Sequence, residues 1–185
     1  MESSECEETP VKVLKSGAVG RIHLNRPDRF NALHEGMLDA VASAANQLDE
    51  DDEIRAVVLS SEGKCFCAGA DIAYMRRAAD FTRDENIRDA GRLSAMYQAL
   101  DAISKPLFAR VHGPTFGGGV GLAAVADLVF VSPRASFSLS EVKLGILPAV
   151  ISPYVVRRTG IVRARGLFGT ALRIPAQDAV AMGLA

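Results

Sequence analysis

The amino-acid sequence predicts a single α/β domain, and two observations carry that prediction. Short apolar runs rich in β-branched residues, typical of buried strands, alternate with longer stretches whose apolar residues recur at helical spacing. This strand, loop, helix, strand unit occurs around residues 54–103 and again around 107–131. Such alternation is characteristic of the α/β class, and no linker divides the chain into two domains.

The first elements expected are a hairpin, a helix and a strand. Residues 11–14 and 19–24 alternate apolar and polar side chains around Ser16-Gly17, which predicts a β-hairpin. Apolar residues at helical spacing then predict a helix over 37–48. Residues 54–59 form an apolar run rich in valine and isoleucine, which indicates a buried strand.

The second half of the chain continues the alternation. The elements expected there are helices at 85–103 and 118–126, strands at 107–111 and 127–131, and short helices at 152–158, 161–169 and 176–182. The first of these helices should stop before Pro106, because the residue before a proline disfavours helical backbone angles. Ser152-Pro153 suggests an N-cap followed by a proline in the first helical turn.

Composition excludes several classes of protein. The chain has 185 residues, enough for one domain with a substantial core, and its net charge of −1 argues against a general nucleic-acid binder. No apolar run approaches the roughly 20 residues that a membrane span needs. Residues 1–10 carry four glutamates and no basic residue, so we expect a disordered acidic leader and neither a signal nor a transit peptide.

The three cysteines are Cys6, Cys65 and Cys67, and none belongs to a Cys-x-x-Cys pair. No zinc site is therefore expected, and no other metal site is indicated. We interpret the thiols as reduced and the compartment as cytoplasmic.

Two separated segments offer backbone groups rather than side chains. They are Cys65–Asp71 and His112–Gly119, and each follows a predicted strand. Two backbone N–H groups directed at one point form an oxyanion hole, which stabilises negative charge developing on a carbonyl oxygen. Glycines at the start of a helix also expose N–H groups that favour negative charge. The alternative interpretation of Gly117-Gly118-Gly119 is a tight, closely packed turn.

Glu141 is the candidate acid/base group. Apolar residues surround it in the sequence, and burial would raise its pKa toward the range useful for proton transfer. The alternative is a surface glutamate paired with Lys143 or Arg134. His112 ends a strand and is expected to be a structural hydrogen-bonding residue.

One competing motif lies at the glycines. Residues 119–124 match G-x-G-x-x-A, and Glu141 follows at about the distance of a ribose-binding acid. We reject a dinucleotide fold because residues 112–116 separate these glycines from the strand, and because the match comes after two other α/β units. Arg26 and Arg29 follow a strand and are either solvated charges or phosphate contacts.

Several motifs in order resemble the enoyl-CoA hydratase (crotonase) superfamily from about Val11 to Ala185. They are Asn25-Arg26-Pro27, Asn31-Ala32-Leu33, Phe66 to Ile72, Val111-His112-Gly113, Gly117-Gly118-Gly119 and Ala123 to Val131. The resemblance implies that residues 11–185 form a crotonase-like spiral of ββα units that binds an acyl-CoA. It implies trimers or dimers of trimers, and no separate cofactor, because coenzyme A is part of the substrate.

The resemblance also implies roles for individual residues. The oxyanion donors would be the N–H groups of Ala70 and Gly118, and Glu141 matches the second of the family's two catalytic glutamates. The implied substrate-binding residues are Arg29, Ala68, Gly69, Asp71, Ile72 and Gly117. Of these, Arg29 lies in the family's CoA-phosphate region, and the backbone of 68–72 would face the adenine.

Three departures from the family pattern stand out. Gly121 occupies the position of the first glutamate, and Ala73 replaces a frequent lysine. The family also continues past Ala185 into helices that cover the acyl pocket and build the trimer, so the chain is expected to be C-terminally truncated. Residues 139–155 resemble the bacterial methylglutaconyl-CoA and isohexenylglutaconyl-CoA hydratase branch, which also tends to carry glycine at the Gly121 position.

The expected activity is therefore that of a lyase that adds water across an enoyl-CoA double bond through a stabilised enolate. Two alternatives remain open. A Δ3,Δ2-enoyl-CoA isomerase needs one proton-carrying glutamate and no water. A non-catalytic acyl-CoA-binding paralogue would account for the missing glutamate.

Overall fold

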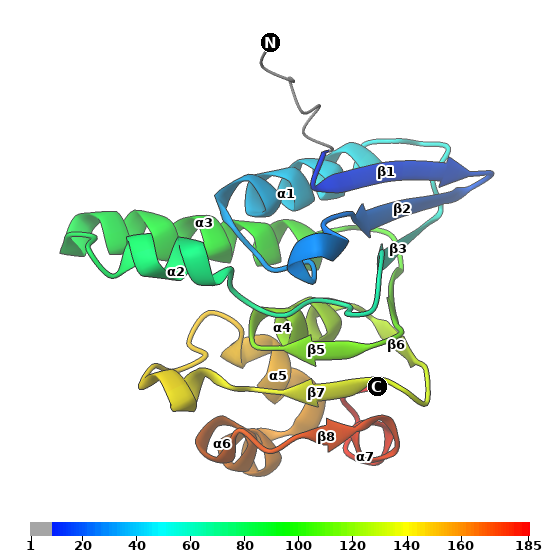
Figure 1. The fold of residues 1–185 in the computed structure, drawn as a ribbon. Coiled ribbons are helices and arrows are strands. Elements are labelled where there is room, and N and C mark those ends of the chain that lie inside the picture. The colour runs from blue at the N-terminus through cyan, green and yellow to red at the C-terminus, as the bar shows by residue number, and fades with distance from the viewer. Residues whose placement is uncertain (1–8) are drawn as a thin grey trace.

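A computed structural model describes residues 9–185 and shows two β-sheets with helices packed around them (Figure 1). The α/β prediction is confirmed. The predicted acidic leader, residues 1–10, lies outside the described residues except for Thr9 and Pro10.

The larger sheet has five strands in the order β1-β2-β3-β4-β6. These strands are β1 (Val11–Ser16), β2 (Val19–Leu24), β3 (Ala56–Ser61), β4 (Leu107–Val111) and β6 (Leu128–Val131). The first two form the expected antiparallel hairpin, with Val11 opposite Leu24, and the other neighbours pair in parallel. Parallel pairing requires crossover connections, which the intervening helices supply.

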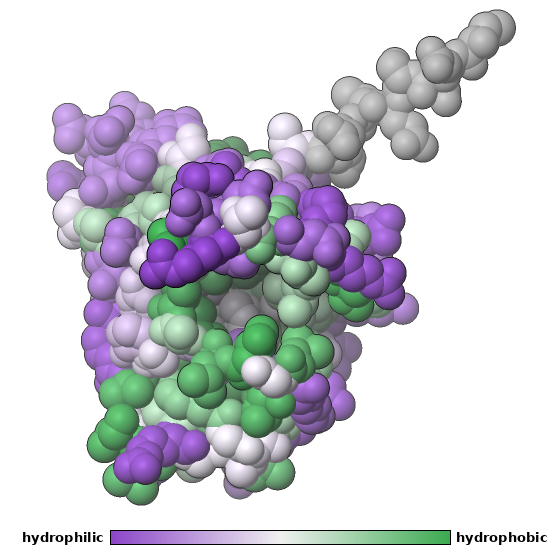
Figure 2. Space-filling model, turned by 90° about the vertical axis from the view of Figure 1, so that its left-hand side faces the viewer, coloured by the Kyte–Doolittle hydropathy of each residue, from purple (hydrophilic) through white to green (hydrophobic). Residues whose placement is uncertain are grey.

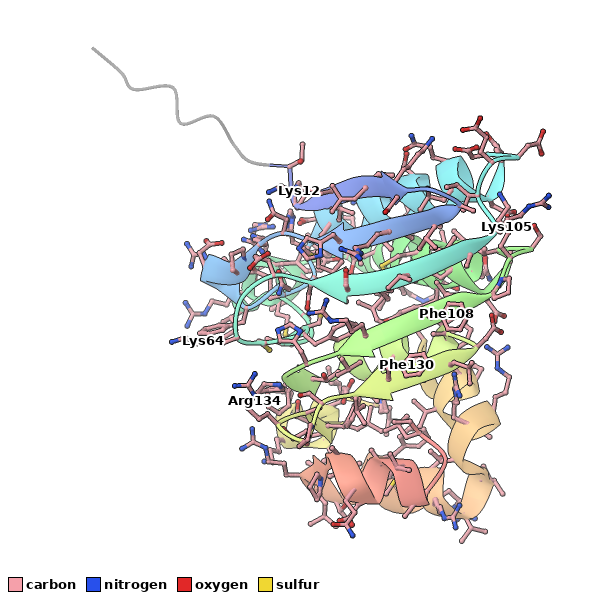
Figure 3. The ribbon with its side chains drawn as sticks, turned by 90° about the vertical axis from the view of Figure 1, so that its right-hand side faces the viewer. Lys12, Lys64, Lys105, Phe108, Phe130 and Arg134 are labelled. Carbon is pink, nitrogen blue, oxygen red and sulfur yellow. The ribbon has the colours of Figure 1, made fainter. Side chains whose placement is uncertain are left out.

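Helices cover one face of this sheet, behind the strands in Figure 3. They include α1 (Glu35–Asp49), α3 (Arg83–Asp101) and α4 (Gly118–Val125). The other face carries Phe108 and Phe130 side by side on neighbouring strands, with ring centroids 6.2 Å apart (Figure 3). The core lies on the helical side, where alternate strand residues are fully buried.

A second, smaller sheet was not expected from the sequence. Its strands are β5 (Pro114–Phe116), β7 (Ser136–Ser138) and β8 (Ile174–Pro175), in that order. β5 and β7 are parallel, and Cys67 pairs with Thr115 to extend the layer. Segments of two or three residues are too short to show a period-2 pattern, which explains why they were missed.

The remaining elements connect and flank the two sheets. They are the 3₁₀ turns η1 (Pro27–Arg29) and η2 (Glu141–Leu144) and the helices α2 (Ile72–Ala78), α5 (Ser152–Thr159), α6 (Ile161–Thr170) and α7 (Ala176–Ala181). Helix α2 was not predicted. The N-cap prediction for Ser152 was wrong: Ile151 is the N-cap, and the Ser152 hydroxyl donates to the Ala149 carbonyl at 2.8 Å.

Two features of residues 9–185 bear on function. Within that range no helix is both long and apolar enough to span a bilayer. The same residues bring together no group of three His, Cys, Asp or Glu side chains of the kind that holds a metal ion. Cys65 and Cys67 are free thiols buried near the junction of the two sheets.

Candidate active site

The two glycine-containing turns predicted from the sequence meet in the structure. Gly69 and Gly117 both have positive φ, +88° and +47°, which other residues rarely adopt. A Cβ on Gly69 would lie 3.0 Å from the Phe116 carbonyl oxygen and 3.7 Å from the Gly117 Cα. Only glycine therefore lets the two backbones approach this closely.

Each glycine turn is followed by a residue whose backbone N–H has no acceptor within residues 9–185. These residues are Ala70, after Gly69, and Gly118, after Gly117. Asp71 N–H donates to Leu33 at 2.8 Å, and Gly117 N–H donates to a β7 carbonyl at 3.0 Å. Ala70 comes directly before Asp71, and Gly118 directly after Gly117. The N–H groups of Ala70 and Gly118 donate to no group in the described part of the chain. Gly118 is the first residue of α4, so its N–H has no intrahelical partner and lies at the positive end of the helix.

The Glu141 carboxylate lies against the second turn. Its Oε1 is 3.1 Å from where a Cβ on Gly117 would be, and η2 begins at Glu141 itself. Oε2 is buried and has no hydrogen-bond partner among the residues described. The alternative of a surface glutamate paired with Lys143 or Arg134 is wrong, because no such ion pair forms within residues 9–185.

Burial raises the pKa of Glu141 above its ordinary value, opposed by a hydrogen bond from its own backbone amide. A raised carboxyl pKa suits proton transfer near neutral pH, because the group can then both accept and return a proton. It also means that ionising Glu141 disfavours the folded state.

Because the pKa of Glu141 is raised in the folded state, removing its charge should stabilise the protein near neutral pH. Glu141→Gln should melt at a higher temperature than the parent near neutral pH, where the buried carboxylate is ionised. The gain should disappear as the pH falls through the raised folded pKa to below the ordinary value of 4.5, because the carboxyl is then neutral in both states. Thermal melts of both proteins across this range check it; a constant or reversed difference contradicts the assignment of a buried charge.

Gly121 stands where the family resemblance implies a first glutamate, and other side chains fill the space beside it. A Cβ on Gly121 would lie 2.4 Å from Ile151 Cγ2 and 2.8 Å from the Tyr97 hydroxyl. Both side chains are buried, with at most 3% of their surface exposed. Among the described residues Glu141 is therefore the carboxylate at the Gly117 turn, and Gly121 has no room for a second one.

The segment implied to face the adenine is held by Asp71. Its carboxylate caps α2 by accepting from the N–H groups of Ala73 and Tyr74, and it forms an ion pair with Arg26 at 2.7 Å. The carboxylate and the Arg26 guanidinium are thus structural. The backbone of Ala68, Gly69 and Ile72 lies beside this cap; the Ala68 N–H donates to Phe30 at 3.0 Å and the Gly69 carbonyl accepts from Leu33 at 2.7 Å.

Arg29 lies in η1 with 68% of its side chain exposed, and its nearest charge is Asp28 at 3.6 Å. It is free to reach an anion outside the protein. His112 behaves as expected, with its Nε2 2.8 Å from the Gly63 carbonyl oxygen.

Removing the Asp71 cap should reveal its double role. Asp71→Ala should lower the free energy of unfolding by at least about 0.5–2 kcal/mol, the usual cost of losing an N-cap, because the ion pair with Arg26 is lost as well. Thr82→Ala is the matched control, because Thr82 caps the neighbouring helix α3 in an exposed capping box. We expect both variants to lose stability, measured by urea unfolding, and only Asp71→Ala to weaken binding of coenzyme A. Equal binding by the two variants would mean that the 68–72 backbone does not face the ligand.

The side of the molecule that carries η2 is hollowed near its centre (Figure 2). Apolar residues gather below the hollow, over the part of the chain that contains η2 and α6, and polar residues lie above it. Val142, Leu144, Ile146 and Leu147 are exposed here, the last by 76%. An apolar rim next to a polar one suits a ligand with an apolar and a charged portion.

Comparison with known proteins shows which family the chain resembles. The model of the enoyl-CoA hydratase/isomerase family matches residues 15–185. Enoyl-CoA hydratase AKT6-1 of Alternaria alternata is 34% identical over 190 residues, covering 100% of this chain and 60% of that protein. The mitochondrial enoyl-CoA hydratase of Pongo abelii is 35% identical over 173 residues, covering 92% of this chain and 57% of that protein.

Solved structures show the same likeness. An enoyl-CoA hydratase from Shewanella pealeana superposes with a TM-score of 0.93 at 37% identity, covering 95% of this chain and 66% of that one. The chain thus spans about three fifths to two thirds of the length of these proteins. With the family model matching almost its whole length and the fold shared with solved members, the chain belongs to the enoyl-CoA hydratase/isomerase family.

Proposed function

We propose that the chain hydrates the double bond of an enoyl thioester of coenzyme A. The observation that carries this proposal is the meeting of three groups at the two glycine turns. These are the N–H groups of Ala70 and Gly118, which have no acceptor among the described residues, and the Glu141 carboxylate, whose Oε2 is buried without a hydrogen-bond partner there. Two donors for a carbonyl oxygen and one proton carrier are the parts that addition next to a thioester requires.

The proposed steps use only these groups. Glu141 accepts a proton from water as the hydroxyl oxygen bonds to C3 of the substrate. The C2–C3 π electrons move toward the carbonyl, and the resulting enolate oxygen accepts hydrogen bonds from Ala70 and Gly118. Glu141 then returns the proton to C2, so one water molecule has been added and the carboxylate is regenerated.

Isomerisation is a second candidate because the site holds one carboxylate. Ile151 and Tyr97 fill the space beside Gly121, which leaves no second group to hold a water. In a 3-enoyl thioester, Glu141 would remove a proton from C2 and return it to C4 through a dienolate bound by the same two N–H groups. This needs no water.

Three thioesters separate the candidates when tested one at a time: crotonyl-CoA, a 3-enoyl-CoA and methylglutaconyl-CoA. Loss of the conjugated absorbance of crotonyl-CoA or methylglutaconyl-CoA would support hydration, and its appearance from the 3-enoyl-CoA would support isomerisation. We propose a branched substrate of the methylglutaconyl type, since residues 139–155 resemble that branch. Binding of all three without turnover would contradict both reactions and leave an acyl-CoA-binding protein.

We also propose that the protein acts in the cytoplasm as a homotrimer or hexamer. The exposed apolar side chains Leu147 and Val162, at 76% and 82%, support association, because burying them in a subunit contact would remove apolar surface from water. Sedimentation at micromolar concentration should show a species larger than a monomer. Leu147→Ser and Val162→Ser should shift it toward the monomer, whereas a monodisperse parent monomer would contradict the proposal.

A further inference from the structure

The Gly118 N–H can stabilise an oxyanion only if its direction is fixed, and its own sequence does not fix it. Gly118 lies between two other glycines, and glycine has the widest backbone freedom of any residue. The peptide that carries the Gly118 N–H is held through its carbonyl, because Gly117 O accepts from Val120 N–H at 2.8 Å and from Gly121 N–H at 3.4 Å. The peptide after Gly118 also receives a hydrogen bond from outside the segment.

That outside contact is the Tyr97 hydroxyl. Tyr97 lies in α3, 21 residues before Gly118, and its side chain is fully buried. Its hydroxyl is 2.6 Å from the Gly118 carbonyl oxygen, at the short end of normal O–H···O distances. Since a carbonyl can only accept, the tyrosine donates. Burial, with smaller effects of Cys67 and Glu141, raises the pKa of Tyr97 well above its usual value, so the donor persists at all working pH values.

Leu33 closes the other side of the same glycine. A Cβ on Gly118 would lie 2.8 Å from Leu33 Cδ1 and 3.2 Å from the Tyr97 hydroxyl oxygen. Leu33 thus limits the position of Gly118, and the Tyr97 hydroxyl holds the peptide after it. Fixing that peptide restricts the backbone angles of Gly118 and, through them, the direction of its N–H. Of the two, only the hydroxyl makes a directional bond.

We propose that Tyr97 is a positioning residue that orients the Gly118 N–H toward the substrate carbonyl. It acts through the Gly118 backbone and not on the substrate, because its single proton is used in the bond to the Gly118 carbonyl. Its catalytic consequence rests on the proposed function. The effect of Tyr97 on the Gly118 backbone does not depend on the proposed function. The backbone effect and the catalytic effect can therefore be tested separately.

The kinetic test uses Tyr97→Phe, which removes the hydroxyl and keeps the ring. Tyr154→Phe is the matched control, since the Tyr154 ring lies 5.5 Å from that of Tyr97. We expect Tyr97→Phe to lower kcat about tenfold, less than the roughly 10²–10³-fold typical for loss of a direct oxyanion donor, with KM nearly unchanged. The infrared band of the bound thioester carbonyl should shift less on binding to Tyr97→Phe than to the parent. Tyr154→Phe should behave like the parent.

A ligand-free measurement tests the backbone effect by itself. The ¹⁵N order parameter of the Gly118 amide should be near the value of about 0.85 typical of rigid backbone in the parent and clearly lower in Tyr97→Phe. If Tyr97→Phe unfolds, Tyr97→4-aminophenylalanine keeps an N–H donor at the same place and should restore both rigidity and the carbonyl shift. Parent-like kcat and an unchanged order parameter in folded Tyr97→Phe would overturn the proposal. A parent that turns over none of the thioesters would overturn the proposed function alone.

Discussion

Replacing Glu141 by glutamine should leave binding of a CoA thioester largely intact and lower turnover by about 10²–10⁴-fold, the usual contribution of a positioned acid/base group. Glutamine has nearly the same shape and still fits against the Gly117 turn, where Oε1 now lies. It can neither accept nor return the proton. Steady-state kinetics with the active thioester, together with calorimetric titration of a CoA ester, measure the two effects separately.

Glu53→Gln is the control for this experiment, because Glu53 is an exposed glutamate in the turn before β3. It should match the parent in both turnover and binding. Near-normal turnover in Glu141→Gln would show that another group carries the proton.

The second large effect concerns the Gly118 N–H. Replacing its amide by an ester through chemical ligation removes the donor and keeps the shape of the turn. Loss of one oxyanion donor should raise the activation free energy by about 2.7–4 kcal/mol. The same replacement at Gly119, the next residue of α4, is the matched control and should have a much smaller effect on kcat. Equal losses at both positions would show that the oxyanion is held elsewhere.

The parts of the site that are local in the sequence could be predicted. Strand β4 and helix α4 were expected within one residue of their observed bounds, since each is a mostly apolar run with clear ends. The two glycine segments and Glu141 were identified because glycine clusters and an isolated carboxylate among apolar residues are unusual. The structure places the two glycine turns and the Glu141 carboxylate close together, and their roles stay predictions.

The parts that depend on distant contacts could not be predicted. Tyr97 lies on the buried face of α3 with Met96 and Leu100, so its spacing cannot be told from that of an ordinary core residue. Ile151 reaches Gly121 only because η2 and the loop after it return the chain to α4. Neither contact has a local sequence signal, because both are set by how the helices pack.

In the proposed site, the N–H groups of Ala70 and Gly118 stabilise an enolate and Glu141 transfers the proton at C2. Exchange of the C2 protons of an acyl-CoA in D₂O, followed by NMR, tests this whether the reaction is hydration or isomerisation. We expect the parent to incorporate deuterium at C2, and both Glu141→Gln and the Gly118 ester to exchange at least about 10²-fold more slowly. Exchange by Glu141→Gln at the parent's rate, or none by the parent, would contradict the claim.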